Sequence, residues 1–296
     1  MAAWTVGGSR NESKRLVVPI TRFQSDVLRL LAAQRSPDSY IAGGVVINRD
    51  GPRISDDIDI FHDTADRLES AVKADAAVLT GAGYIMTWPQ NQRTGKRTAT
   101  IEKFGEQMQL EWVADSAFRF FPTQPDELFG YVLHPVDLAA NKAAAAADRR
   151  VARDIVDLVT IHEDILPLGA VVAAAVGKFP GTTPEEMLAE ITRHSRFTAE
   201  EFQALATEQP INVPTLHRRI REMIEAAEGF IAELPSDAVG VVFLEGDKPV
   251  LPDLSALGKY RRNPGAPSGL WPSSPEIARG MLDRYVEPKP SGPGSI

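Results

Sequence analysis

The chain has 296 residues, enough for about two domains, and its 43% of hydrophobic and 24% of charged residues are typical of a globular protein. It contains no cysteine, which excludes disulfides, cysteine-bound zinc or iron–sulfur sites and a cysteine nucleophile. Acidic residues outnumber basic residues by eight, 40 against 32, which disfavours a protein that nucleic acid wraps over much of its surface.

The first 134 residues mix helix and strand patterns. Residues 1–17 are polar and are expected to form a loose lead-in, without the apolar core of a secretory signal. Apolar residues spaced three and four apart predict helices over 19–34 and 66–83. Short β-rich runs, two of them arranged as a hairpin, predict strands over 40–48, 57–61, 84–88, 97–104 and 107–113.

After residue 134 nearly the whole sequence has helical periodicity. The longest largely apolar stretch, 165–177, is too short for a membrane span and contains Pro167 and Gly169. We therefore expect a cytoplasmic protein without membrane contact. The helices expected in this part cover 136–147, 149–165, 168–176, 184–193, 199–206 and 214–234.

The end of the chain is rich in proline. One more strand is expected over 240–246, and nine of the 22 prolines fall in 248–296, which predicts a linker-like tail with one short helix over 275–285. The expected fold class is α+β in three parts. These are a domain with a small mixed sheet flanked by helices, an all-helical domain and a partly disordered Pro-rich extension, over residues 1–134, 135–238 and 239–296.

Three carboxylates form the most informative cluster, in the segment IAGGVVINRDGPRISDDIDIF. Asp56, Asp57 and Asp59 come twelve to fifteen residues after Gly44. Asp57 and Asp59 share one face of the predicted strand, with Cα atoms roughly 6.6 Å apart. Two like charges at this distance are costly unless a cation lies between them. Hard carboxylate oxygens suit Mg²⁺, or Mn²⁺, which keeps room for water and substrate phosphates.

The glycine pair Gly43–Gly44 has a matching role. It lets the backbone turn tightly after a strand and lets a triphosphate approach bare N–H groups. Arg53 and Ser55 lie just upstream of the carboxylates and are candidates for contact with the same phosphates. A glycine pair alone is often an ordinary turn, and an Asp-x-Asp pair alone a solvated strand edge. Their order and spacing together favour a nucleotide site.

This segment resembles the nucleotidyltransferase superfamily of the DNA polymerase β type and, within it, is most similar to the AbiEii/AbiGii toxin family. The family pattern is Gly-Gly-Thr-Ala-Leu, then Arg-x-Ser, then two alternating Asp residues. Val45 departs from it, because a hydroxyl residue is expected there and would bond to a phosphate. The superfamily has a third carboxylate on a neighbouring strand. Glu111, inside the run QMQLEWV, is the first candidate, and Asp115 at the strand end is the competitor.

A second match to the toxin family lies in VDLAANKAAAAADRRVARDIVDL, residues 136–158. The family carries a Lys, a short Ala-rich gap, an Arg and then Arg-Asp-x-x-Asp-Leu. The matching positions here are Lys142, Arg149 or Arg150, Arg153, Asp154, Asp157 and Leu158.

The spacing of this second segment gives expectations of its own. Asp148 is expected to cap a helix that begins at Arg149. Arg153 and Asp157 are four residues apart, so they share a helix face and can pair. Lys142 is expected to end the preceding helix and to reach back to the nucleotide phosphates. Taken alone, the segment is also typical of an ordinary pair of charged helices.

The resemblance implies an enzyme that transfers an NMP from an NTP, such as ATP, to a hydroxyl of tRNA or of a protein, with a separately encoded antitoxin as partner. It implies a metal held by Asp57, Asp59 and Glu111. The implied catalytic residues are these three, Lys142 and Asp157, and the nucleotide-binding residues are Gly43, Gly44, Arg53, Ser55, Lys142 and Arg153. Two alternatives stay open: a housekeeping nucleotidyltransferase that acts on a small molecule, and an inactive nucleotide-binding relative.

Overall fold

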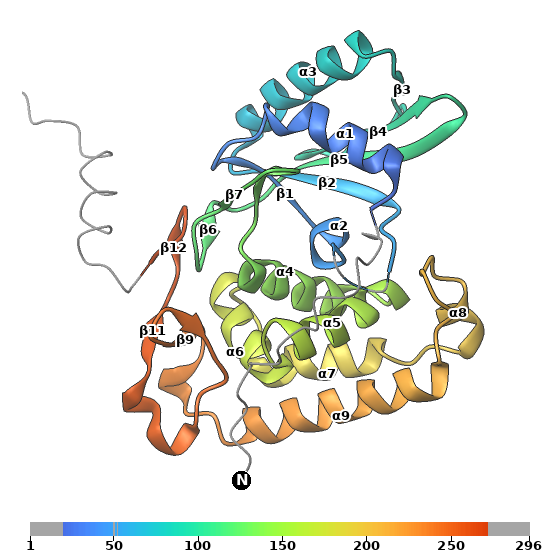
Figure 1. Cartoon of the computed structure of the whole chain (residues 1–296). Helices are drawn as coiled ribbons and strands as arrows, with labels where there is room; N and C mark the ends of the chain where they lie inside the picture. The colour runs from blue at the N-terminus through green and yellow to red at the C-terminus, as the bar shows by residue number, and fades with distance from the viewer. Residues whose placement is uncertain (1–19, 50, 52, 272–296) are drawn as a thin grey trace, which may run out of the picture.

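A computed structural model describes residues 20–49, 51 and 53–271 of the chain, and Figure 1 shows two layers of structure in it, a sheet with helices above and a bundle of helices below. The predicted lead-in over 1–17 and the predicted helix over 275–285 lie outside the described residues. The predicted α+β class is confirmed.

The sheet has seven strands in the order β3-β4-β5-β2-β1-β8-β7. It is mixed, because β2 runs antiparallel to β1 and parallel to β5. The pattern of short strands and hairpins predicted most of it, but β7 and β8 were not expected. The bounds are β1 Ser39–Ala42, β2 Asp57–His62, β3 Ile85–Thr87, β4 Lys96–Lys103, β5 Glu106–Ala114, β7 Gln124–Asp126 and β8 Gly130–Val132.

One face of the sheet is covered by α1 (Arg22–Ala32) and α3 (Ala65–Gly81), as Figure 1 shows. Ile58 and Ile60 of β2 are fully buried on this face and belong to one hydrophobic core with residues of α1 and α3. Because side chains alternate along a strand, the burial of the two isoleucines turns the intervening residues of β2 toward the opposite face.

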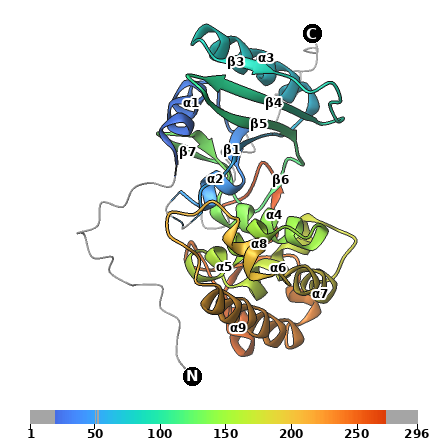
Figure 2. The ribbon, with the colours of Figure 1, turned by 90° about the vertical axis from the view of Figure 1, so that its right-hand side faces the viewer.

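The opposite face looks onto the helical layer, as Figure 2 shows from the side, and this layer has a second hydrophobic core. This core also takes in Tyr40, Ala42, Phe120 and Phe121 from the first part of the chain. The predicted division near residue 134 stays a prediction, and the two parts share side chains across it. The helices are α4 Pro135–Asp148, α5 Ala152–Asp164, α6 Leu168–Lys178, α7 Pro184–His194, α8 Ala199–Gln203 and α9 Val213–Ala232.

Within 20–49, 51 and 53–271, no single helix is both long enough and apolar enough to cross a membrane. Only α5 and α6 taken together have the necessary length and composition, and they are bent by 112° relative to each other.

Two local expectations differ from the structure. The second half of the β-rich run over 40–48 is helical, because α2 (Gly44–Ile47) starts directly at the glycine pair. Asp148 caps no helix: it is the last residue of α4, and α5 begins at Ala152 after Val151, which makes no side-chain cap.

The Pro-rich part is not linker-like where the structure describes it. The strand expected over 240–246 is confirmed as β9 (Val242–Glu245), which pairs with β10 (Lys248–Pro249) and β11 (Arg261–Asn263). β12 (Ala266–Pro267) pairs with the short strand β6 (Phe118–Arg119). Asn263 is fully buried and donates to the Phe120 carbonyl at 2.8 Å, so this segment is anchored to the sheet layer.

His62 at the end of β2 is fully buried, and neither ring nitrogen has a hydrogen-bond partner. Burial, together with the charges of Arg35 and Arg67, lowers the pKa of His62 to about 3, against a weaker opposing effect of Asp38. In the unfolded chain the imidazole of His62 takes up a proton near pH 6.5, whereas in the folded protein it does not. His62 therefore costs no stability above pH 6.5, and the protein loses stability as the pH falls from 6.5 toward 3.

We expect the free energy of unfolding of the wild type to drop between pH 7 and pH 4 by on the order of 2–3 kcal/mol more than that of His62→Gln. Urea titrations at the two pH values measure this difference. His217→Gln, at an exposed position, is the matched control and should behave like the wild type. An equal acid loss in wild type and His62→Gln would contradict the assignment.

Candidate active site

Three acidic side chains come together on the sheet face that looks onto the helical layer. Asp57 and Asp59 alternate with the buried isoleucines of β2 and so share one face of the strand. Glu111 likewise alternates with buried residues of β5 and lies on the same face of the sheet. In the parallel pairing of β2 with β5, Asp59 lies directly beside Glu111. The structure thus brings Glu111 to the carboxylate pair, whereas Asp115 lies four residues farther along the strand direction.

The pKa of Asp59 reflects the electrostatic cost of placing these carboxylates close together. Burial raises its pKa to about 7, with the negative charges of Asp57 and Glu111 adding to the effect. Lys142 and Lys96 oppose the rise but do not cancel it. At neutral pH the site therefore holds more negative charge than its own cations balance, which favours the binding of an added cation.

A divalent cation fits part of this acidic set. Within the part of the chain that the structure describes, no three His, Asp or Glu side chains are arranged so as to hold a metal ion. One reason is that Lys96 Nζ is bound to Glu111 Oε2. Mg²⁺ needs only one or two protein carboxylates, because water and substrate phosphates complete its shell. Asp57 and Asp59 meet that requirement.

The glycine pair lies against the carboxylates. A Cβ atom on Gly43 would be 1.9 Å from Asp59 Oδ2, and Gly43 has a φ of +73°, which residues with a side chain rarely adopt. A Cβ atom on Gly44 would be 2.4 Å from Arg53 Nη2 and 2.9 Å from Ser55 Oγ. Gly43 is favoured both by its φ and by this close approach, whereas a side chain on Gly44 would require Arg53 and Ser55 to shift.

Arg53 and Ser55 turn inward beneath the glycine pair. Ser55 Oγ donates to Asp57 Oδ1 at 3.1 Å, and only 3% of this residue is exposed. Arg53 Nε and Nη2 each donate to Asp157 at 3.0 Å, and only 2% of the residue is exposed. In this structure Arg53 fixes the loop through Asp157, and its contact with a phosphate stays a prediction.

Asp157 of α5 is the centre of a buried ion-pair network. Besides Arg53, it accepts from Asn48 Nδ2 at 2.8 Å and pairs with Lys142 Nζ at 3.0 Å. Lys142 Nζ also donates to Asp154 at 2.8 Å. Burial alone would raise the pKa of Asp157, but Lys142 and Arg53 outweigh burial and hold the pKa below its usual range.

Two expectations for the helical segment are therefore revised. Lys142 does not end a helix: it lies inside α4, is 9% exposed and pairs with two aspartates, and its contact with a phosphate stays a prediction. Arg153 does not pair with Asp157. Its guanidinium lies 3.6 Å from Asp57 and 3.8 Å from Asp56, so it faces the carboxylate site.

Sequence reasoning missed two residues of the site. Asn48 joins the Gly44 carbonyl, at 3.0 Å, to Asp157, and thereby ties α2 to α5. Lys96 of β4 neutralises Glu111. Asn48 is 109 residues from its partner Asp157, and no spacing rule in a single sequence connects two such positions.

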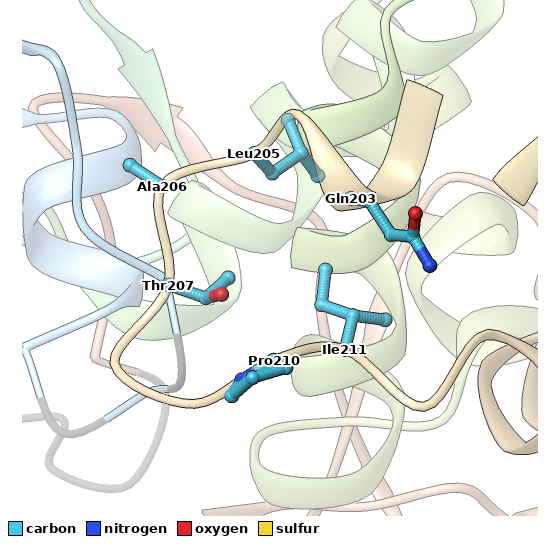
Figure 3. A pocket seen from close by; sticks show the side chains of 6 residues that line it. All are labelled: Gln203, Leu205, Ala206, Thr207, Pro210 and Ile211. Atoms are coloured by element: carbon cyan, nitrogen blue, oxygen red, sulfur yellow. The ribbon is translucent and has the colours of Figure 1, made fainter. Parts of the chain in front are cut away.

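Two hollows lie near this network. One, of about 400 Å³, is formed by the loop after α8 and is lined by Gln203, Leu205, Ala206, Thr207, Pro210 and Ile211 (Figure 3). Its lining contains no charged side chain. The same loop accepts a hydrogen bond from Ile54 N at the Ala206 carbonyl, which braces the segment that carries Arg53 and Ser55. The other hollow, of about 600 Å³, lies between the sheet and helices α4 and α7.

Comparisons with known proteins identify the family of the chain. The profile of the family described as "Nucleotidyl transferase AbiEii toxin, Type IV TA system" matches residues 29–233. The solved structure of MenT4, a nucleotidyltransferase toxin from Mycobacterium tuberculosis H37Rv, is 17% identical, with a TM-score of 0.51 over 73% of this chain and 84% of that chain. A crystal structure of an H. pylori protein assigned as a nucleotidyltransferase is 14% identical, with a TM-score of 0.42 over 72% and 94% of the two chains. No curated protein matches the sequence.

Proposed function

Because the chain belongs to the AbiEii nucleotidyltransferase toxin family, we propose that it transfers a nucleoside monophosphate from an NTP to an acceptor hydroxyl and that this reaction arrests growth. The observation that carries the proposal is the pair Asp57 and Asp59 on the sheet face that looks onto the helical layer, beside a glycine turn where a Cβ atom on Gly43 would clash with Asp59. Retention of two close carboxylates argues against an inactive relative, because without a cation their repulsion is uncompensated.

In this proposal the triphosphate lies along the turn at Gly43 and Gly44. Asp57 and Asp59 would hold Mg²⁺ or Mn²⁺, which when bound neutralises charge that builds up on the transferred phosphate and on the leaving pyrophosphate. Arg153 faces the same carboxylates and supplies a further positive charge. Glu111 lies beside Asp59 on the neighbouring strand β5 and is bound to Lys96. In this proposal it accepts the proton of the attacking hydroxyl.

Lys142 and Asp157 act in this proposal as positioning residues. Asp157 holds Arg53 and Asn48, and these two hold the loop with Ser55 and the start of α2. Lys142 balances the charge of Asp157 and Asp154 and lowers the pKa of Asp59 from one side of the site. Their loss would misplace the glycine turn rather than remove a contact with the nucleotide.

The family description names a toxin–antitoxin system, so we propose a cognate antitoxin as partner. The acceptor is proposed to be a macromolecule that growth requires. A housekeeping enzyme acting on a small molecule would instead leave growth unaffected when it is expressed alone.

Expression in a bacterial host tests the proposal together with an assay of the purified protein. We expect the wild type to slow growth and to transfer label from an α-labelled NTP, with Mg²⁺ present, to a component of a cell extract. Asp59→Asn should do neither, and co-expression of the cognate antitoxin should restore growth. Equal toxicity of wild type and Asp59→Asn would show that binding rather than catalysis causes the arrest, and the proposal would be wrong.

A further inference from the structure

The hollow of about 600 Å³ continues the carboxylate face beyond Asp59. Phe61 lies on the same face of β2 as Asp57 and Asp59, and it lines this hollow. It lies roughly 6.6 Å beyond Asp59 along the strand. The other walls come from Asp115 after β5, Asn141 and Ala145 of α4, and Phe179 after α6. The hollow therefore begins where the floor of the proposed active site ends.

We propose that this hollow is the acceptor subsite and that it holds an unpaired nucleobase next to the attacked hydroxyl. The inference rests on the proposed nucleotidyl transfer. β1 runs antiparallel to β2, with Ala42 beside Asp59, so the glycine turn that follows Ala42 lies toward the Asp57 end of β2. In an in-line displacement the attacking oxygen enters opposite the leaving group. With pyrophosphate at the glycine turn, the acceptor enters from the Phe61 end.

The lining of the hollow selects for a flat group that donates hydrogen bonds. Two aromatic rings, Phe61 and Phe179, form part of its walls and suit stacking against a base. Asn141 Oδ1 is buried and has no hydrogen-bond partner, and a buried acceptor of this kind is costly unless a ligand donates to it.

The charged groups of the lining point to the same class of ligand. The charged lining residues are Asp115, Asp148 and Glu190, all of them acidic. Lys178 and Arg193 pair with two of them from outside the lining, so the hollow itself offers a phosphate group no cation. An amino-bearing nucleobase is uncharged and brings N–H donors, whereas a serine or tyrosine side chain of a protein acceptor brings a single O–H donor. The lining thus favours an RNA end over a protein side chain.

The phosphates of the acceptor strand have a separate place outside the hollow. The loop between β3 and β4 touches the end of β5, because Ala114 N donates to the Gly95 carbonyl at 2.8 Å. Arg93, two residues before Gly95, is exposed. It is therefore a candidate to contact a backbone that leaves the hollow past the strand end that leads into Asp115.

Filling the hollow tests its role. Ala145→Trp places a large side chain in it, and Ala226→Trp on the exposed face of α9 is the matched control. With α-labelled NTP, Mg²⁺ and total RNA, we expect Ala145→Trp to lower RNA labelling at least about tenfold while its affinity for NTP stays that of the wild type. The control should label RNA as the wild type does.

A second variant tests the base contact without filling the hollow. The acceptors are oligoribonucleotides that end in adenosine or in purine riboside, which lacks only the exocyclic amino group. We expect the wild type to prefer adenosine about tenfold in kcat/KM, and Asn141→Leu to lose that preference.

The possible results separate the subsite from the function it rests on. Labelling of RNA by Ala145→Trp at the wild-type rate would overturn the subsite while nucleotidyl transfer stands. Labelling of a protein or a small molecule but not of RNA, or an absent preference for adenosine in the wild type, would overturn the nucleobase as occupant. A wild type that labels no acceptor would overturn the proposed function and the subsite together.

Discussion

Asp57→Asn and Asp59→Asn will each lower nucleotidyl transfer by about a thousandfold or more, which corresponds to about 4 kcal/mol of transition-state stabilisation. Both carboxylates face the site from alternate positions of β2, and each amide replaces one of the two carboxylates proposed to bind Mg²⁺. Initial rates with saturating NTP and total RNA measure the loss. Near-wild-type activity in either variant would contradict the assignment of the metal to this pair.

The neighbouring Asp56 provides the matched control. Its side chain is 69% exposed, and its only ion pair among the described residues is with Arg153 at 3.8 Å. Asp56→Asn removes the same charge from the same segment, but it should change the rate by less than about threefold, since exposed ion pairs contribute little.

Asp59→Asn should also make the metal-free protein more stable. The raised pKa of Asp59, about 7, means that the folded protein holds this proton more tightly than the unfolded chain. Stability is therefore lost as the pH rises from about 4 to about 7. At pH 8 the variant should gain on the order of 1–3 kcal/mol in free energy of unfolding, and at pH 4 it should gain nothing.

Asp157→Asn will destabilise the fold by about 3–5 kcal/mol, because it leaves the buried cations Arg53 and Lys142 without their shared counter-charge. Asn keeps the volume of the side chain, so the loss reports charge and hydrogen bonding rather than a cavity. Chemical denaturation monitored by tryptophan fluorescence measures the free energy of unfolding.

Asp164→Asn at the exposed end of the same helix is the control for Asp157→Asn and should shift stability by less than about 0.5 kcal/mol. If Asp157→Asn folds as stably as the control, then the network around Asp157 is not what holds the glycine turn in place. Loss of activity in a stable Asp157→Asn protein would instead assign this carboxylate to the chemistry.

Much of the site was predictable because its main signals are local. The alternation in β2 predicts that Asp57 and Asp59 share a face, and the glycine pair before it predicts a tight turn. The strand carrying Glu111 was also predictable from alternation alone. Its position directly beside Asp59 depends on the register of two parallel strands, which the sequence does not encode locally.

The functions of Lys142, Arg53 and Arg153 were harder to predict because they depend on long-range contacts. Helical spacing alone pairs Arg153 with Asp157, but tertiary packing turns Arg153 to Asp57 and gives Asp157 to Arg53 and Lys142. A lysine in an Ala-rich helix looks exposed until the partner helix is placed. Likewise, β11 and β12 lie in a Pro-rich stretch, and only pairing with distant strands stabilises them.

The contacts that join Asp157 to the glycine turn can form only late in the synthesis of the chain. The carboxylates of β2 leave the ribosome first, about a hundred residues before the aspartate that fixes Arg53 and Asn48. Until Asp157 has emerged and α5 has docked, Arg53 and Asn48 lack the partner that fixes the glycine turn. A nascent or truncated chain therefore has the acidic residues of β2 but not the arrangement of the complete site, and translation of the helical part has to come before that arrangement.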